Sequence, residues 1–127
     1  MSLRSPLGKV LGLGAASGVH HWWVQRTTSI ALIPLGLWFV AALLALPNLS
    51  HPVVYHWLER PLNSVLMLLF IGAVTYHSWL GVVVVLEDYV HDKGTKIAAL
   101  LIAQFLHLLI GAAALLAVIK VTLGGPV

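Results

Sequence analysis

The sequence contains no cysteine and few charged residues, and each absence excludes a class of structure or site. Without cysteine, the 127 residues form no disulfide and offer no thiolate ligand to a metal ion or an iron–sulfur cluster. Charged residues make up 9% of the chain, whereas soluble domains have about a quarter. Apolar residues make up 60%, and the mean hydropathy is +0.98. The composition therefore excludes an ordinary soluble domain and predicts an integral membrane protein.

Three long stretches without a charged side chain predict three transmembrane helices, because a span needs about 20 predominantly apolar residues. They cover about residues 27–46, 62–86 and 97–119. Pro34 lies inside the first stretch and predicts a kink in a continuous helix, since neighbouring groups in a membrane satisfy the freed carbonyl. The fold class is therefore all-α, an integral membrane bundle of three transmembrane helices. Residues 1–26 form an N-terminal cytoplasmic or interfacial segment, and residues 27–127 form the membrane domain.

The lysines and arginines are divided unequally between the two ends of the predicted spans. Five lie on the N-terminal side and two on the opposite side, namely Arg4, Lys9, Arg26, Lys93 and Lys96 against Arg60 and Lys120. The positive-inside rule then predicts a cytoplasmic N-terminus and a C-terminus on the opposite side. The net charge of +3 is too small and too scattered to indicate nucleic-acid binding.

The segments outside the three spans have weaker sequence signals, and we expect most of them to be loops. Residues 5–18 are too glycine-rich for a firm helix prediction. Residues 48–61 and 87–96 are expected to be connecting loops, with His51, His56 and His91 as solvated loop residues. Of the charged second loop, four residues are expected to be a solvated turn, namely Glu87, Asp92, Lys93 and Lys96.

Two histidines lie within the predicted spans, where ionisable side chains are costly and are functional candidates by default. His77 and His107 lie at similar depths near the middle of their spans. Neutral imidazole is a common ligand of haem iron, so His77 is predicted to be an axial ligand of a b-type haem. For His107 two alternatives stay open: a second ligand to the same haem, or packing beside Gln104 and Gly111.

The helical face of His77 leads from mid-membrane to the cytoplasmic surface. At about 100° per residue, Gly81 and Asp88 share this face, with Asp88 about 16 Å closer to the surface. Gly81 leaves room for a flat macrocycle near the backbone, and its alternative role is helix packing. Asp88 and Tyr89 are expected to face the same layer as Arg26. A phenol and a carboxylate near water suit quinone reduction, which needs a hydrogen-bond donor and proton carriers. The alternative for Tyr89 is an aromatic membrane belt.

Basic and aromatic residues surround the start of the first span. The rigid guanidinium of Arg26 suits a haem propionate or a quinone pocket, and its alternative role is a snorkelling topology anchor. Trp22 and Trp23 fit an interfacial anchor. His20 and His21 are expected to be interfacial, with propionate contact or proton delivery as the alternative.

Two strings carry a family resemblance: GVHHWWVQRTTSIALIPL at residues 18–35 and HSWLGVVVVLEDYVH at residues 77–91. The chain resembles the small cytochrome b membrane-anchor subunit of succinate dehydrogenase, respiratory complex II. By matched position, the resemblance implies that His77 is one axial ligand of haem b, shared with a second anchor subunit that supplies the other. It implies that Tyr89 hydrogen-bonds a ubiquinone carbonyl, with Asp88 delivering protons and Arg26 near the propionates and the quinone pocket.

The resemblance also implies partners and a place in metabolism. A flavoprotein subunit with FAD, an iron–sulfur subunit with its clusters and the second cytochrome b anchor complete a four-subunit enzyme, and a trimer of such complexes is allowed. The complex passes electrons from succinate to ubiquinone in the respiratory chain and the tricarboxylic acid cycle, and the isolated chain is not expected to oxidise succinate. The absence of a transit segment favours the bacterial inner membrane over the mitochondrial one.

Three alternative functions remain open from the sequence. The first is an anchor of a quinol:fumarate reductase, because the direction of electron flow follows cofactor potentials. The second is a proton relay through His77 and His107, which needs a polar path across the membrane. The third is a structural assembly subunit without a cofactor.

Overall fold

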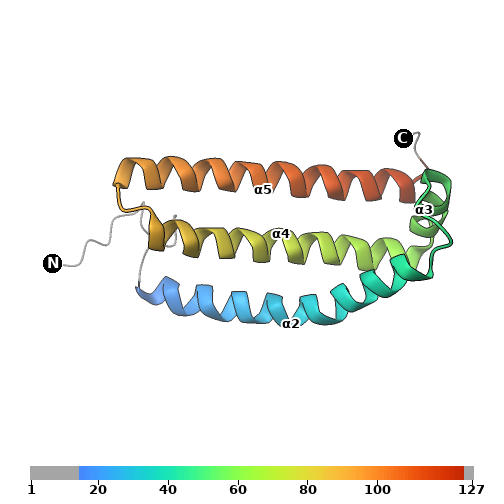
Figure 1. Ribbon diagram of the computed structural model, residues 1–127, viewed down its shortest axis with the longest axis horizontal. Helices are drawn as coiled ribbons and strands as arrows, with labels where there is room; N and C mark the ends of the chain where they lie inside the picture. Colours follow the sequence, from blue (N-terminus) through green and yellow to red (C-terminus); the bar gives the residue numbers. More distant parts are fainter. Residues whose placement is uncertain (1–14, 125–127) are drawn as a thin grey trace.

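Three long helices lie side by side, and one short helix packs at one end of the bundle (Figure 1). The computed structural model describes the backbone of residues 15–124 and the side chains of residues 22–124. The elements are α2 (Ala15–Ala45), α3 (His51–Leu58), α4 (Pro61–Tyr89) and α5 (Lys93–Thr122). The segments Trp22–Ala45, Pro61–Tyr89 and Lys93–Thr122 are long and apolar enough to cross a membrane. The predicted all-α membrane bundle with three transmembrane helices is confirmed.

Helix α2 is longer than the uncharged stretch 27–46 predicts. It begins at Ala15 and continues without interruption past Pro34 to Ala45. Figure 1 shows α2 curving in its second half toward α3. A proline removes one backbone hydrogen bond and its ring crowds the carbonyl four residues earlier, which bends a helix. The part of the predicted N-terminal segment before residue 15 lies outside the described residues.

The first connection contains a helix, so the prediction that His51 and His56 are loop residues is wrong. Both lie on α3, although both side chains are exposed as expected. Pro52 stands in the first turn of α3, where its missing N–H costs no helical hydrogen bond. Trp57 of α3 stacks on Trp38 of α2, with ring centroids 5.7 Å apart. This stack ties the short helix to the end of the bundle.

The second connection is a tight hairpin of residues 90–92, so the prediction of a loop over residues 87–96 is wrong: α4 continues to Tyr89 and α5 begins at Lys93. His91 is exposed between the helices, as expected. Asp92 caps α5, because its carboxylate accepts hydrogen bonds from the N–H and the hydroxyl of Thr95, both at 2.8 Å. The backbone N–H of Thr95, followed by its hydroxyl, holds the pKa of Asp92 below its usual range. The cap therefore stabilises α5 above the pKa of a free carboxyl and weakens as the pH falls through the lowered pKa.

Helix α4 is the central helix, packed against α2 on one side and α5 on the other (Figure 1). Few large apolar side chains among residues 22–124 are buried: Leu80 and Val83 of α4 with Val118 and Val121 of α5. Many large apolar side chains along the spans are exposed, among them Ile30, Leu37, Leu44, Leu108 and Ile110. Lipid or other subunits must cover these faces, because such an apolar surface is not stable in water.

The closest approach of α4 and α5 occurs at Gly111. A Cβ atom built on Gly111 would lie 2.8 Å from Cγ2 of Thr75 and 3.2 Å from its Oγ1. Thr75 is β-branched and has few alternative rotamers in a helix, so the contact cannot relax easily. Small residues that let helix backbones approach closely are a common basis of helix association in membranes.

We expect Gly111→Ala to destabilise this helix pair by about 1–3 kcal/mol, the usual cost of overpacking. Thermal unfolding of the purified membrane protein would measure the loss. Thr75→Ser removes the clashing methyl group and should restore part of the stability in the double variant. Gly72→Ala is the matched control, because no atom lies within 4 Å of its Cβ position. Equal losses from both glycine substitutions would contradict the packing role.

Candidate functional site

His77 points toward α2, where the hydroxyl of Thr28 meets its ring. Thr28 Oγ1 lies 3.0 Å from Nδ1 of His77, and it also lies 2.9 Å from the carbonyl oxygen of Val24 and 3.0 Å from that of Gln25. A carbonyl oxygen only accepts hydrogen bonds, so when the hydroxyl of Thr28 donates to the backbone, its oxygen can accept a proton from Nδ1 of His77. In that arrangement Nδ1 carries the ring proton. This tautomer leaves a free lone pair on Nε2.

No other hydrogen bond to the His77 ring occurs among residues 22–124, and the side chain is half-buried. The Nε2 atom is therefore available to a group outside this chain. In the same part of the chain, no three His, Cys, Asp or Glu side chains gather to hold a metal ion. A metal bound at His77 would therefore need further ligands from outside the described part of this chain.

Gly81 lies one helical turn from His77, and its surroundings are open. No atom of the described chain lies within 4 Å of a Cβ atom built on Gly81. Helix packing inside this chain therefore does not require the glycine. The open space beside the backbone fits the approach of a flat group or of another subunit.

Arg26 is exposed and lies over the indole of Trp22, with its guanidinium carbon 5.3 Å from the ring centroid. This contact is a cation–π interaction. Among residues 22–124 no carboxylate pairs with Arg26. Its charge is therefore free to meet an anionic group from outside the chain.

Asp88 and Tyr89 are the last two residues of α4. Both side chains are exposed, and the exposed fraction of Tyr89 is 79%. Tyr89 stands about 18 Å beyond His77 along the helix, at about 1.5 Å per residue. Arg26 is only two residues from Thr28, which contacts His77, so its backbone lies about 3 Å from that depth. The expectation that Arg26 shares a layer with Asp88 and Tyr89 is therefore wrong. The antiparallel register brings Arg26 closer to the depth of His77.

His107 is at the depth of His77 but is used differently. Its Nδ1 donates to the carbonyl oxygen of Ala103 at 2.8 Å, and its Nε2 accepts from Ser78 at 3.1 Å. Both nitrogens are thus occupied, and no lone pair is left for iron. The hydrogen bond joins α4 to α5, which supports the packing alternative for His107 and neither the shared-ligand nor the relay alternative.

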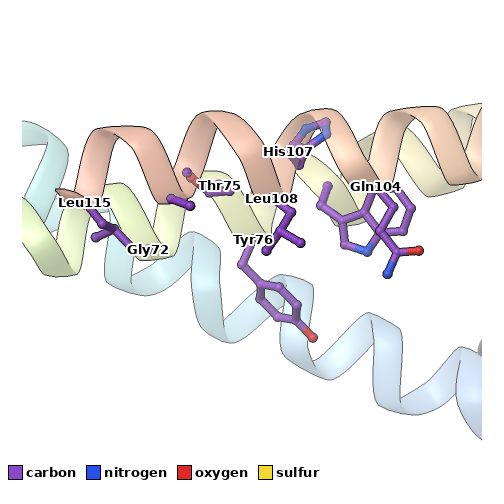
Figure 2. Close-up of a pocket in the computed structure, with 10 residues that line it drawn as sticks. Gly72, Thr75, Tyr76, Gln104, His107, Leu108 and Leu115 are labelled. Carbon is purple, nitrogen blue, oxygen red and sulfur yellow. The ribbon is translucent and has the colours of Figure 1, made fainter. Parts of the chain in front are cut away.

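A hollow of about 380 Å³ lies beside His107, between α4 and α5 (Figure 2). Tyr76 and Gln104 are its exposed polar residues. Gly72 and Gly111 also line the hollow, and without side chains they leave it more space. Figure 2 shows the phenol of Tyr76 extending from α4 toward the viewer's side of α2. His77 does not line this hollow, so the two histidines serve different faces of the bundle.

Thr28 and Ser78 are the polar partners that sequence reasoning did not single out. Each bonds a histidine on another helix. A hydroxyl inside an apolar span is the only signal that marks them, and the same signal marks Thr27 and Ser29, which bond their own helix. The side chains of His20 and His21 lie outside the described residues, and only their backbone, within α2, is described.

Comparison with known proteins identifies the relatives of this chain. Residues 1–118 match the family described as the succinate dehydrogenase/fumarate reductase transmembrane subunit. The succinate dehydrogenase hydrophobic membrane anchor subunit of Rickettsia bellii is 38% identical over 88 residues, covering 68% of this chain and 70% of the relative. The succinate dehydrogenase membrane anchor subunit of Reclinomonas americana is 33% identical over 91 residues, covering 69% and 76%.

A more distant relative covers almost the whole length. The hydrophobic membrane anchor subunit of Paracoccus denitrificans succinate dehydrogenase is 27% identical over 125 residues, 98% of this chain and 96% of the relative. No solved structure matches the chain. The three apolar helices and these matches lead to one conclusion: the chain belongs to the succinate dehydrogenase/fumarate reductase transmembrane-subunit family, as a membrane-anchor subunit of succinate dehydrogenase.

Proposed function

We propose that this anchor subunit holds haem b jointly with a second anchor subunit and forms part of the ubiquinone-reduction site. The observation that carries the proposal is the ring of His77, with Nδ1 bonded to Thr28 and Nε2 free. Iron-ligating histidines have this arrangement, in which one ring nitrogen donates to an acceptor and the other binds the metal. The residues present therefore fit a haem that would take one nitrogen ligand from this chain and another from the second anchor subunit.

Three residues of this chain would hold the haem. His77 supplies the nitrogen ligand, Gly81 leaves space beside the backbone, and Arg26 offers an unpaired positive charge near the same depth. Propionates are carboxylates, which the planar guanidinium fork of arginine binds well. When bound, the haem supplies a one-electron redox centre within the membrane.

Tyr89 and Asp88 contribute this chain's part of the quinone site. Ubiquinone becomes ubiquinol by taking up two electrons and two protons, so its carbonyl oxygens need a hydrogen-bond donor and a source of protons. The exposed phenol of Tyr89 can donate to one oxygen, and the neighbouring carboxyl group of Asp88 can pass a proton from the aqueous side. Residues of the second anchor and of the iron–sulfur subunit would complete the pocket.

The orientation and partners follow from the same assignment. The N-terminus is cytoplasmic in this proposal, because Lys93 and Lys96 lie in the first turn of α5 at one end of the bundle and Arg60 precedes α4 at the other. The flavoprotein with FAD and the iron–sulfur protein bind at the end that carries Tyr89, where electrons are needed. The names of the relatives support succinate oxidation over the fumarate reductase alternative. The bacterial inner membrane is the proposed location.

Capture of the native complex tests this proposal. We expect that a tag on this chain, in detergent, recovers a flavoprotein and an iron–sulfur subunit together with a b-type haem. Optical spectra of the oxidised, succinate-reduced and dithionite-reduced sample should show the α and Soret bands of six-coordinate haem. A complex that contains the redox subunits but no haem would contradict the haem assignment and leave the anchor role intact.

A further inference from the structure

The link between Thr28 and His77 joins two helices and ends on the backbone. We propose that Thr28 is a positioning residue: its hydroxyl oxygen accepts the Nδ1 proton of His77, fixes the rotation of the ring and directs Nε2 toward the haem iron. This inference rests on the proposed function, in which His77 ligates haem. It adds a residue on α2 to a site whose ligand is on α4.

The surroundings of Thr28 allow its hydroxyl oxygen to accept from His77. The hydroxyl has one proton and three neighbours within 3.0 Å: the carbonyl oxygens of Val24 and Gln25, and Nδ1 of His77. The Gln25 oxygen also accepts from Ser29 at 2.8 Å, which leaves the Val24 oxygen as the better acceptor for Thr28. With the hydroxyl proton on the Val24 oxygen, the Thr28 oxygen accepts from Nδ1–H of His77. We assign the Nδ1–H tautomer because it also leaves the Nε2 lone pair for a metal.

The backbone of α2 makes Thr28 a well-defined acceptor. A threonine in a helix has few χ1 rotamers, and the bond to the carbonyl four residues earlier selects one of them. The oxygen is thus held in place before the imidazole approaches it. In the apolar interior an imidazole N–H without an acceptor would cost free energy, so the ring turns to keep this contact.

The bond also affects the electronic state of the ligand. An acceptor on the Nδ1 proton increases the electron density on Nε2 and strengthens it as a donor to iron. A stronger donor stabilises the ferric form over the ferrous form. Loss of the Thr28 oxygen should therefore raise the midpoint potential of the haem and loosen its binding.

The neighbouring Thr27 provides a matched control. Its hydroxyl donates to the carbonyl oxygen of Trp23 at 2.9 Å, and the residue is exposed. It has the same side chain, one residue away, with no contact to a histidine. Thr27→Val and Thr28→Val thus remove the same chemical group, and only Thr28→Val removes the link to His77.

The experiment compares Thr28→Val, Thr28→Ser and Thr27→Val in the complete purified complex. Haem per flavin, the optical spectrum and the haem midpoint potential are measured for each. We expect Thr28→Val to raise the potential, with about 59 mV for each tenfold change in the ferric-to-ferrous affinity ratio, and to weaken haem binding by about tenfold or more. Thr28→Ser keeps the acceptor and should behave as the unmodified complex does, as should Thr27→Val.

Haem loss in Thr28→Val with normal flavin content and normal Thr28→Ser also supports the inference. Equal potentials and haem contents in Thr28→Val and Thr27→Val would overturn it, as would equal defects in Thr28→Val and Thr28→Ser. Failure of the proposed function gives a different result, because the complex would then keep its haem spectrum when His77 itself is replaced.

Discussion

Replacing His77 with alanine is expected to remove or loosen the haem while the flavoprotein and iron–sulfur subunits remain attached. The substitution deletes the free Nε2 atom and the Thr28 link together. Loss of an outer partner of a metal ligand alone weakens binding by about 10- to 100-fold, so loss of the ligand itself should cost at least as much. Haem per flavin and the reduced-minus-oxidised spectrum of the captured complex measure the effect.

His107→Ala is the matched control for this prediction. It removes an imidazole at the same depth, but one whose two nitrogens bond Ala103 and Ser78. We expect normal haem content and a loss of stability of about 1–3 kcal/mol from the unpaired groups left behind. Addition of free imidazole should restore the spectrum in His77→Ala and have no effect on His107→Ala. An unchanged haem spectrum in His77→Ala would rule out the ligand assignment.

The three spans could be predicted from hydropathy alone, because a lipid environment leaves the helix as the simplest way to satisfy the backbone. The helix ends could not. An uncharged run marks the part of a helix that lies in hydrocarbon, and backbone hydrogen bonding continues past it to Ala15 in α2 and to Tyr89 in α4. Helix α3 was missed because eight residues carry too little periodicity, although Pro52 after Ser50 is a recognisable helix start.

The candidate site could likewise be predicted in part from the sequence. The sequence indicates that His77 and His107 lie at one depth, and the Ser78–His107 bond confirms it, because Ser78 is adjacent to His77. The sequence does not indicate what each ring bonds, since that depends on the register and rotation of neighbouring helices. Arg26 illustrates the limit: its place at the start of an uncharged run suggested the membrane surface, whereas the pairing of Thr28 with His77 fixes it deeper.

Tyr89→Phe is expected to slow the reduction of ubiquinone by succinate and to spare succinate oxidation by an artificial acceptor. The phenol is at the end of α4 and 79% exposed, so its hydroxyl has no structural partner to lose within the described chain. A lost hydrogen bond to the quinone oxygen, about 1–3 kcal/mol, corresponds to a rate loss of about 5- to 150-fold. Steady-state rates with the two acceptors, measured on one preparation, give the ratio.

Tyr76→Phe is the control, because it makes the same chemical change on the same helix, beside the hollow between α4 and α5. Both acceptor rates should stay normal in that variant. Equal loss of both rates in Tyr89→Phe would indicate damage to the docking of the iron–sulfur subunit, and equal quinone defects in the two tyrosine variants would indicate a general effect of losing a phenol. A selective loss in Tyr89→Phe, with the haem spectrum unchanged, separates the quinone site at the helix end from the haem ligand about 18 Å away along α4.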